Sequence, residues 1–369
     1  MTKKITLISW HYLLSKRKAG FHWLADAYHK MGYEVLFITA PISWASKLRK
    51  DFRFEYPILE EANKFIEKEP RLFSYVLFTF LHPLNLRISW LNQFISPFVI
   101  DLYKKNNLGE AELFIQNSDF IVFESTPALI LFEKFKQLNP SAKFIYRVSD
   151  DARLMGFHPK VIEEEVRIVS KFDHVSVPCQ YIFDIHKTFN SSNNMTLDLH
   201  GLKKAIFDKD SPNPYNTEKV VNLIFVGNSH FDYQFLTITS DLFQDWMFHI
   251  IGPIPNLPKK NNIIAYGEMP FSKTVAYIKH ANIGLLTLSY KKGAESFTDS
   301  LKTIQYTYCR LPIAAPSYLS STRTNMFYYE PGDSESIRNC LEKASRFEKS
   351  AVDISSVLGW RELANRLLS

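Results

Sequence analysis

Short apolar runs alternate with segments of helical spacing in the amino-terminal half of the chain. Lys4–Trp10 predicts a buried strand, Phe21–Met31 has the apolar spacing of a helix, and Glu34–Thr39 predicts a second apolar strand. This strand–loop–helix–strand order is typical of a parallel sheet with crossover helices. The same pattern predicts further elements: strands at Phe120–Phe123, Lys143–Val148 and His174–Val177, and a helix at Ala128–Leu138.

The polar segment Asp208–Lys219 interrupts this pattern. It has two prolines and no apolar periodicity, which indicates an interdomain linker. The α/β pattern then restarts, with a helix at Phe271–His280 and strands at Val220–Val226, Met247–Ile251, Ile263–Tyr266 and Ile283–Leu288. We therefore predict an α/β protein with domains over residues 1–205 and 220–355, a linker over 206–219, and a final segment, 356–369, whose amphipathic helix Trp360–Leu368 crosses back.

Composition and charge narrow the class of protein. Apolar residues make up 46% of the chain and charged residues 22%, which excludes a disordered or fibrous protein. Residues 1–100 hold 14 Lys and Arg against 8 Asp and Glu, a difference of +6 that equals the net charge of the whole chain. This basic quarter suits a membrane surface, a phosphate-bearing lipid or a nucleic acid, and a solvated basic face is an equal alternative. Three widely spaced cysteines, Cys179, Cys309 and Cys340, indicate a reducing compartment.

Membrane contact is expected without membrane insertion. No apolar run reaches the roughly 18 residues of a spanning helix, and the run after Lys3 and Lys4 is too short for a signal peptide. The segment Trp44–Lys105 mixes aromatic residues with Lys and Arg, as monotopic membrane proteins do. Nucleic-acid binding and core packing use the same residue types. We therefore expect a protein that does not cross a membrane but lies on its surface.

Two aspartates are candidates for catalysis. Asp150 and Asp151 follow the predicted strand Lys143–Val148, and ligands bind outside the carboxyl ends of strands in open parallel sheets. A carboxylate there can remove a proton from an attacking hydroxyl. Capping of the next turn is the commoner role of Asp and stays an alternative.

The start of a predicted helix in the second domain is a candidate anion site. Asp299 or Ser300 is a good N-cap, and a helix that begins at Leu301 offers N–H groups and the positive end of its dipole. Lys302 adds a full charge, and Gln305 lies one turn further on the same side. This arrangement suits a departing diphosphate, although an ordinary capped helix with an exposed lysine fits the same pattern.

Three other patterns in the sequence give weaker evidence for a functional site. The loop His11–His22 has a basic cluster that includes Arg17 and Lys18, but Gly20 stands alone, so no dinucleotide fingerprint is present. The D-x-D string at residues 208–210 resembles a metal motif of some sugar transferases, yet it opens the predicted linker. The 11 histidines show no zinc-type spacing. We therefore expect no metal site.

Two long stretches resemble the GumK-type glucuronosyltransferases of xanthan-like polysaccharide synthesis. The first is VFESTPALILFEKFKQLNPSAKFIYRVSDD, residues 122–151, and the second is YGEMPFSKTVAYIKHANIG, residues 266–284, followed by DSLKTIQY. Weaker echoes occur at residues 11–22, at HPLNLRISW (residues 82–90) and at His200-Gly201. The matches occur in the same order along most of the chain, so they concern both domains.

The resemblance implies the GT-B fold, in which two Rossmann-like domains face each other across a cleft and a carboxyl-terminal helix packs back on the amino-terminal domain. It implies inverting, metal-independent transfer of glucuronate from UDP-glucuronate to a lipid-linked oligosaccharide, with no cofactor beyond the donor and no nucleic-acid partner. It also implies a cytoplasmic protein attached peripherally to the inner face of the cell membrane. By position, Asp150 matches the catalytic base. The resemblance assigns the donor site to Glu268, Met269, Tyr290, Lys302 and Gln305, and the acceptor or membrane side to His11, Arg17, Lys18 and His22.

The sequence departs from the family pattern near the donor sugar. Ser229 stands where a methionine is expected, Leu288 stands where a tyrosine is expected with Tyr290 two places later, and the loop from Ser289 to Thr298 is short. These departures concern the donor sugar more than the reaction, so another UDP-sugar remains an alternative. A sugar-nucleotide epimerase and a non-catalytic protein that binds membranes or nucleic acid are further alternatives.

Overall fold

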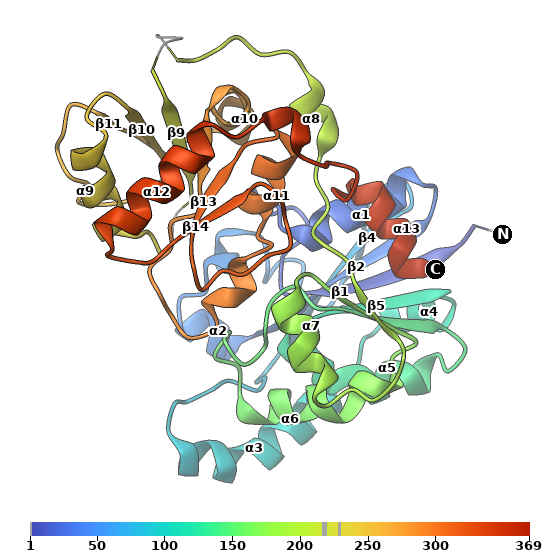
Figure 1. The fold of residues 1–369 in the computed structure, drawn as a ribbon. Helices are drawn as coiled ribbons and strands as arrows, with labels where there is room; N and C mark the ends of the chain where they lie inside the picture. Colours follow the sequence, from blue (N-terminus) through green and yellow to red (C-terminus); the bar gives the residue numbers. More distant parts are fainter. Residues whose placement is uncertain (1, 216–219, 228–229) are drawn as a thin grey trace. The chain divides into compact units, whose positions relative to one another are not determined.

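The computed structural model describes residues 2–215, 220–227 and 230–369. The chain divides into two compact units (Figure 1): unit 1 contains Met1–Leu199 and Trp360–Ser369, and unit 2 contains His200–Gly359. The change from unit 1 to unit 2 falls a few residues before the predicted linker. None of the described helices is long and apolar enough to span a bilayer.

Unit 1 is built on an eight-stranded sheet with the order β3-β4-β2-β1-β5-β6-β7-β8. Only the pair β3–β4 is antiparallel among the ladders of the described residues. The strands are β1 Lys4–Ser9, β2 Glu34–Ser43, β3 Phe65–Glu69, β4 Leu72–Thr79, β5 Phe120–Glu124, β6 Lys143–Arg147, β7 His174–Val177 and β8 Met195–Leu197. The helices are α1 Gly20–Lys30, α2 Trp44–Leu48, α3 Ser89–Lys104, α4 Ala111–Gln116, α5 Phe132–Leu138, α6 Pro159–Ile168, α7 Gln180–Lys187 and α13 Trp360–Leu368, with 3-10 turns η1 Phe52–Glu55, η2 Pro127–Leu131 and η3 Val169–Lys171.

The phenylalanine-rich composition is used in the core of unit 1. Phe123 from the central strand β5 packs edge-on against Phe135 and Phe172, with ring centroids 5.3 and 5.9 Å apart. Phe132 packs against Phe144 of β6 in the same way, at 5.4 Å. Edge-to-face ring pairs add stabilisation beyond the area they bury. The aromatic content of this unit therefore largely serves the core.

Helix α13 returns to unit 1 from the far end of the sequence, as the predicted fold class requires. It lies beside α1 (Figure 1), where the Tyr28 hydroxyl donates to the Ala364 carbonyl at 3.0 Å. His174 Nδ1 bonds the Leu367 carbonyl at 2.9 Å. Leu363 and Leu367 are fully buried, in agreement with the predicted apolar face. The final helix thus completes the amino-terminal fold.

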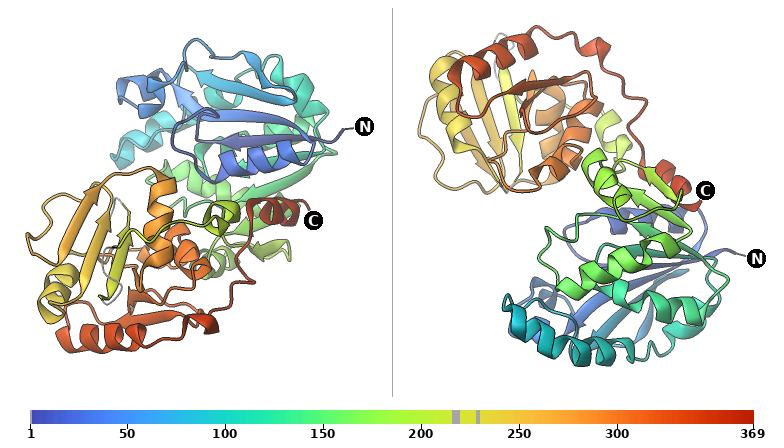
Figure 2. Two further views of the ribbon diagram at one scale, coloured as in Figure 1. Left: turned by 90° about the horizontal axis from the view of Figure 1, so that it is seen from above. Right: turned by 60° about the horizontal axis from the view of Figure 1, so that its bottom comes forward.

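Unit 2 has a six-stranded, all-parallel sheet with the order β11-β10-β9-β12-β13-β14. In Figure 2 helix α12 lies along this sheet in both views. The strands are β9 Asn222–Val226, β10 Met247–Ile251, β11 Ile263–Gly267, β12 Ile283–Leu285, β13 Ile313–Pro316 and β14 Met326–Tyr329. The helices are α8 Lys204–Asp208, α9 Tyr233–Leu242, α10 Phe271–His280, α11 Leu301–Tyr308 and α12 Ser334–Ser345, with 3-10 turns η4 Ala294–Phe297 and η5 Lys349–Ala351.

The strand order of unit 2 is that of a Rossmann fold, 3-2-1-4-5-6 when its strands are numbered within the unit. Successive strands are added on one side of β9 and then on the other, so the order reverses between β9 and β12. Ligands of such sheets bind at this reversal, outside the carboxyl ends of the strands. The carboxyl end of β9 is therefore where a ligand of unit 2 is expected.

The described part of the predicted linker packs on unit 2. Lys279 Nζ donates to the Lys209 carbonyl at 2.6 Å, and His280 Nε2 bonds the Ser211 carbonyl at 2.9 Å. The Tyr215 hydroxyl donates to the Tyr277 carbonyl at 2.7 Å, and Tyr215 is buried. Residues 209–215 are thus an ordered covering over α10, despite their polar, proline-containing sequence.

Candidate active site

A buried carboxylate ties together the carboxyl ends of three strands in unit 1. Glu124, at the end of β5, accepts hydrogen bonds from the Ser9 hydroxyl at 2.6 Å and the Trp10 amide at 3.1 Å, both at the end of β1. Its other oxygen accepts from the Ser149 hydroxyl at 2.9 Å, just after β6. The strand order of unit 1 reverses between β1 and β5, so Glu124 lies at the reversal point.

The residues after β6 are held by a second contact from the end of β5. The Ser125 hydroxyl accepts the backbone amides of Ser149 and Asp150 at 3.0 and 3.1 Å. Two neighbouring amides on one oxygen fix the backbone direction at this point, and hence the direction of the Asp150 side chain. Sequence reasoning named Asp150 but missed Glu124 and Ser125, although both directly follow the predicted strand Phe120–Phe123.

The two candidate aspartates have different environments. Arg153 binds Asp151 through Nε at 2.8 Å and Nη2 at 2.7 Å, and the Arg153 amide donates to the same carboxylate at 3.0 Å. Asp151 is 5% exposed, so its carboxylate is buried and paired. Asp150 is exposed, and among the described residues its carboxylate has no cation or hydrogen-bond donor. Of the two, Asp150 is the one available to a substrate.

The surroundings of Asp150 make its carboxylate more basic than usual. Loss of hydration is the largest cause, followed by repulsion from Glu124 and then from Asp151, and together they raise the pKa of Asp150 from 3.8 to about 6. The side chain still reaches solvent, so a substrate hydroxyl can approach it. At neutral pH the group is mostly ionised and accepts a proton more readily than an ordinary aspartate.

The loop 11–22 divides into a structural part and an exposed part. His22 is 4% exposed; its Nδ1 accepts the Ala19 amide at 2.9 Å and its Nε2 donates to the Tyr12 carbonyl at 2.8 Å. Burial is the main reason that the pKa of His22 falls to about 4. These two hydrogen bonds close the loop, and the acceptor-side role of His22 stays a prediction.

The other three residues assigned to this loop reach the surface. His11 is partly exposed, with its ring centroid 5.4 Å from that of His22. Arg17 and Lys18 are exposed, and Lys18 Nζ donates to the Leu13 carbonyl at 3.0 Å. The loop thus presents three exposed basic residues, Lys16, Arg17 and Lys18, at the carboxyl edge of the unit 1 sheet.

In unit 2, Lys302 reaches the carboxyl end of β9. Its Nζ lies 3.9 Å from the centre of the Phe225 ring, and a Cβ built on Gly227 would lie 3.0 Å from it. Within the described part of the chain Nζ forms no ion pair or hydrogen bond. Burial without a counter-charge lowers the pKa of Lys302 from 10.5 to about 7. An ammonium group in this setting gains stabilisation from any anion that binds beside it.

Glycines keep the space around Lys302 open. Gly252, after β10, has φ +135°, and a Cβ there would lie 1.7 Å from the Gly227 carbonyl oxygen. Only glycine fits that close approach of two chain segments. Gly227 and Gly252 thus let the loops after β9 and β10 meet without side chains, which leaves backbone and the Lys302 ammonium facing the reversal point of the sheet.

The start of α11, which is the candidate anion site, has Ser300 as its N-cap. The helix begins at Leu301, and the Ser300 hydroxyl accepts the Thr303 amide at 3.5 Å. Asp299, the other candidate cap, binds Arg323 at 2.9 Å instead. In an α-helix the first amides have no partner within the helix, so this end of α11 offers donors as well as Lys302. Gln305 lies one turn on and is partly exposed.

The remaining residues assigned to the donor lie on other loops of unit 2. Glu268 and Met269 follow β11 directly, with Glu268 exposed and Met269 packed partly into the core. Tyr290 lies beyond β12, is 67% exposed, and meets the Tyr318 ring edge-on at 5.2 Å. These loops share the carboxyl edge of the sheet with β9. The departure at Ser229 falls outside the described residues.

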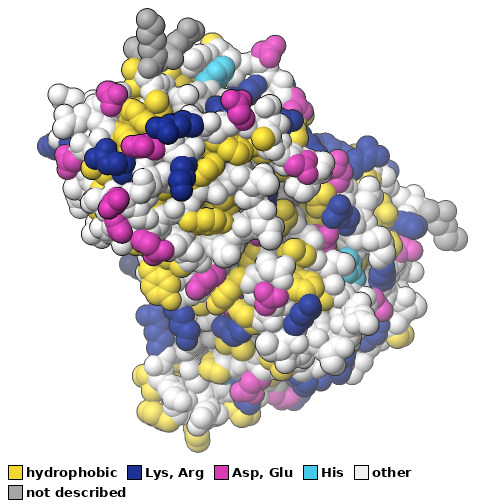
Figure 3. Space-filling model, viewed as in Figure 1, with side chains coloured by type: hydrophobic (Ala, Val, Ile, Leu, Met, Phe, Trp, Pro, Cys, Tyr) yellow, Lys and Arg dark blue, Asp and Glu magenta, His cyan; other side chains and the backbone are white. Residues whose placement is uncertain are grey.

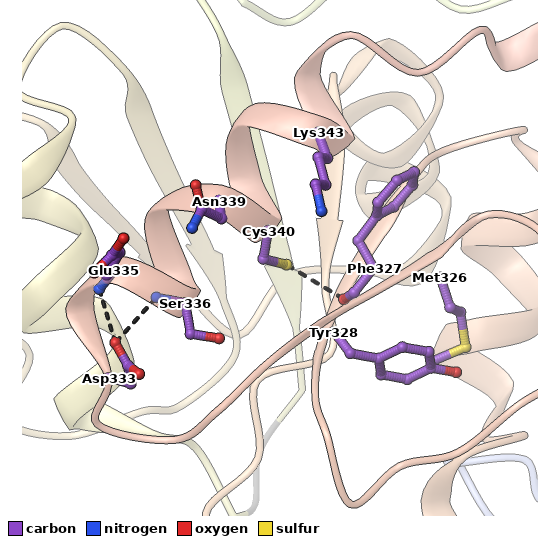
Figure 4. Close-up of a pocket in the computed structure, with 9 residues that line it drawn as sticks. All are labelled: Met326, Phe327, Tyr328, Asp333, Glu335, Ser336, Asn339, Cys340 and Lys343. Atoms are coloured by element: carbon purple, nitrogen blue, oxygen red, sulfur yellow. Dashed lines mark hydrogen bonds between the residues drawn. The ribbon is translucent and has the colours of Figure 1, made fainter.

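Two other features, a possible metal motif and a surface hollow, involve none of the residues assigned to the donor or the acceptor. In the described ranges no group of three or more His, Cys, Asp or Glu could hold a metal ion, and Asp208 of the D-x-D string accepts the Tyr308 hydroxyl at 2.7 Å. A hollow of about 570 Å³ runs along β14 and α12 (Figure 4). Asp333 at its rim caps α12 by accepting the amides of Glu335 and Ser336. None of the nominated residues lines this hollow.

Comparison with solved structures identifies the fold class of the protein. Among solved structures, the sucrose-phosphate synthase of Thermosynechococcus elongatus matches with a TM-score of 0.64 and 13% identity, over 99% of this chain and 97% of the other. The calicheamicin glycosyltransferase CalG4 matches with a TM-score of 0.52 and 14% identity, over 100% and 98% of the two chains. These likenesses concern the fold, and they confirm the expected GT-B architecture of two Rossmann-like domains.

Sequence comparisons narrow the class further. The family model described as "Glucuronosyltransferase GumK, N-terminal domain" matches residues 7–178. A curated protein of Xanthomonas campestris pv. campestris, the UDP-glucuronate:glycolipid 2-beta-glucuronosyltransferase, is 27% identical over 365 residues, covering 98% of this chain and 88% of the relative. The protein is a glycosyltransferase, and its resemblance to the GumK-type glucuronosyltransferases is confirmed.

Proposed function

We propose that this protein transfers glucuronate from UDP-glucuronate to a lipid-linked oligosaccharide, with inversion at the anomeric carbon and without a metal ion. The name of the curated relative supports the donor, the glycolipid type of acceptor and a β-linked product. UDP-glucuronate carries its sugar in α linkage, so a β product means inversion. The observation that carries the proposal is the unpaired Asp150 carboxylate at the carboxyl end of β6.

Asp150 is the general base of this reaction. The acceptor hydroxyl attacks the anomeric carbon from the face opposite UDP, the bond to the diphosphate oxygen breaks, and the hydroxyl proton passes to Asp150. A pKa near 6 keeps Asp150 ionised at neutral pH while making it a stronger base than an ordinary aspartate. Glu124 and Ser125 act as positioning residues, since they hold the backbone that directs Asp150.

Lys302 stabilises the departing UDP. Charge grows on the diphosphate as the sugar leaves, and a cation with amide donors in a poorly hydrated site stabilises that charge strongly. Lys302 and the first turn of α11 provide both, which supports a reaction without a divalent metal. Glu268, Met269, Tyr290 and Gln305 form the rest of the donor site in this proposal.

The acceptor is reached at the cytoplasmic face of the membrane. Apolar side chains project over α3 at the bottom of Figure 3. Trp90, Phe94 and Phe98 of that helix are 69%, 83% and 68% exposed. They recur every four residues and so form one stripe, with Arg87 nearby. Aromatic stripes beside cations suit an interface of anionic lipid head groups.

A thermal-shift panel with UDP, GDP, UDP-glucuronate, UDP-glucose and NAD tests this function. A ligand at about 100 times its dissociation constant adds roughly 2.7 kcal/mol of stability, which is a visible shift. The proposal requires a shift with UDP compounds only, largest with UDP-glucuronate, and the same shift after treatment with EDTA. A flat response to all UDP compounds overturns it, and a larger shift with UDP-glucose changes the donor.

A further inference from the structure

An apolar chamber of about 250 Å³ lies within unit 1, beneath helix α3. Its walls come from α2, α3 and the segment that links β4 to α3. Its apolar lining includes Ala45, Leu81, Leu84, Leu86, Val99 and Ile100. An apolar chamber of this kind is suited to hydrocarbon, because its lining offers few hydrogen-bonding groups that could hold water.

A second, polar hollow of about 390 Å³ shares a wall with the chamber. Asn92, Ser96 and His158 line both spaces. These wall residues are held in place, since His158 Nε2 bonds the Ser96 hydroxyl at 2.8 Å and the Asn92 amide donates to the Asn85 side chain at 3.0 Å. The wall between the polar hollow and the chamber is therefore fixed by hydrogen bonds.

The polar hollow carries the charge that an anionic head group needs. Arg87 and Lys160 both line it, together with Glu163, so the hollow has one net positive charge. Lys160 Nζ pairs with Glu163 at 2.5 Å, whereas no ion pair involves Arg87 in the described ranges. An apolar chamber that joins a basic hollow matches a molecule with a hydrocarbon chain and an anionic group at its root.

Helix α3 connects this chamber to the surface stripe. Trp90, Phe94 and Phe98 face outward, while Ser96 and Val99 of the same helix line the chamber. A hydrocarbon chain leaving a lipid surface would therefore cross only one helix to enter the chamber.

The chamber is also tied to the proposed base. The segment from Asp150 runs eight residues to His158, and the Asn85 amide, at the polar hollow, donates to the Phe157 carbonyl at 3.2 Å. Eight residues span at most roughly 28 Å, so the polar hollow lies no further than this from Asp150. The chamber thus lies within reach of a lipid whose sugar end meets Asp150.

We propose that this chamber binds the hydrocarbon chain of the lipid-linked acceptor next to its phosphate group, with Arg87 and Lys160 facing the phosphate. The proposal rests on the proposed function, because it takes the lipid-linked acceptor from there. It adds a protein site for the lipid itself, apart from contact with the bilayer. No bond is made or broken at this site.

Isothermal titration with farnesyl diphosphate, in saturating UDP to block the donor site, tests the proposal. Wild type should bind saturably. Val99→Trp fills the chamber and should raise Kd at least about tenfold, the loss expected for two or more buried methylene groups. Leu113→Trp is the control, since it places the same side chain at an exposed position of α4 that lines neither hollow, and it should change Kd by less than about twofold.

Arg87→Glu is the second variant, in case Val99→Trp fails to fold. Arg87 is exposed, so this change leaves the core intact while it reverses the charge beside the phosphate, and it should also weaken binding about tenfold. UDP-glucuronate binding by every variant is measured in parallel, so a failed donor site is recognised separately. Equal Kd values for wild type, Val99→Trp and Arg87→Glu overturn the proposal. So does wild-type binding to phosphatidylglycerol vesicles without saturable binding of farnesyl diphosphate.

Discussion

Arg153 binds the Asp151 carboxylate through two nitrogens, at 2.8 and 2.7 Å, and thereby separates the roles of two adjacent aspartates. Asp151 is buried and neutralised, whereas Asp150 is exposed. Position in the sequence alone did not distinguish them. Asp150→Asn and Asp151→Asn are therefore a matched pair of isosteric substitutions at neighbouring positions.

Asp150→Asn should reduce kcat by about 10² to 10⁴-fold, the usual contribution of a general base. Because Asp150 is assigned no contact with the nucleotide, the Kd for UDP should stay within about twofold. Steady-state transfer kinetics and UDP titration measure both. Asp151→Asn is the control: it breaks a charged hydrogen-bonded pair at a buried carboxylate and should cost about 1–3 kcal/mol of unfolding free energy. Near-normal turnover in Asp150→Asn removes the base assignment.

The raised pKa of Asp150 should make the stability of the protein depend on pH. The native state holds the Asp150 proton more tightly than the unfolded chain, because the pKa is raised from 3.8 to about 6. The unfolded state therefore binds fewer protons between these values, so the contribution of Asp150 to stability falls as pH rises from about 4 to 6. Asp150→Asn should match wild type in Tm near pH 4 and exceed it above pH 6. An Asp150→Asn variant that melts below wild type at pH 8 would contradict this environment.

Lys302→Met should weaken UDP-glucuronate binding at least about tenfold, the loss expected for a charge-assisted contact. The pKa of Lys302 is near 7 without ligand, and an adjacent diphosphate should raise it. Wild type should then take up roughly one proton on binding at pH 8, and Lys302→Met none. Calorimetry in two buffers of different ionisation enthalpy counts that proton. Equal uptake by both proteins would show that another group titrates.

The same substitution should change stability in a defined direction. A lowered pKa means that the unfolded chain binds the Lys302 proton more tightly, so wild-type stability gains from this group as pH rises from about 7 to 10.5. Without ligand, Lys302→Met should therefore be at least as stable as wild type at pH 7. A large loss of Tm at pH 7 would indicate a structural role for the ammonium group.

The α3 stripe should control membrane attachment. Replacing Trp90, Phe94 and Phe98 together by Ser should strongly reduce cosedimentation with phosphatidylglycerol vesicles, because most of the exposed apolar surface of α3 is lost. Leu113→Ser is the control, since Leu113 on α4 is 69% exposed and lies outside the stripe. Vesicle binding by the triple variant at the wild-type level would move the contact surface elsewhere.

Hydrophobic periodicity predicted the sheet strands around the site well. Four predicted elements agree with the structure at both ends: His174–Val177, Met247–Ile251, Phe271–His280 and Trp360–Leu368. The predicted strand Ile263–Tyr266 ends one residue before β11, Ile263–Gly267. Each has an apolar period bounded by polar residues or a turn, so local information suffices. The N-cap of α11 was predicted at Asp299 or Ser300 for the same reason, because a cap and its amides are close in sequence, and the structure has Ser300 there.

Long-range contacts could not be predicted in this way. Glu124 meets Ser9 across 115 residues, and no local pattern marks two strand ends that become neighbours only when the sheet forms. Strand β4, Leu72–Thr79, was missed because its apolar residues continue toward His82 and Pro83, so its end has no clear signal. The division of Trp44–Lys105 between core and surface also depends on which face of α3 the fold covers.

The most direct test of the central claim is the transfer itself. Purified protein, UDP-glucuronate and a lipid-linked oligosaccharide extract are incubated with EDTA, and proton NMR follows UDP release and the new anomeric signal. We predict a β-linked glucuronate in the lipid fraction with wild type and almost none with Asp150→Asn. An α-linked product, transfer undiminished in Asp150→Asn, or conversion of the donor without any acceptor would contradict the account.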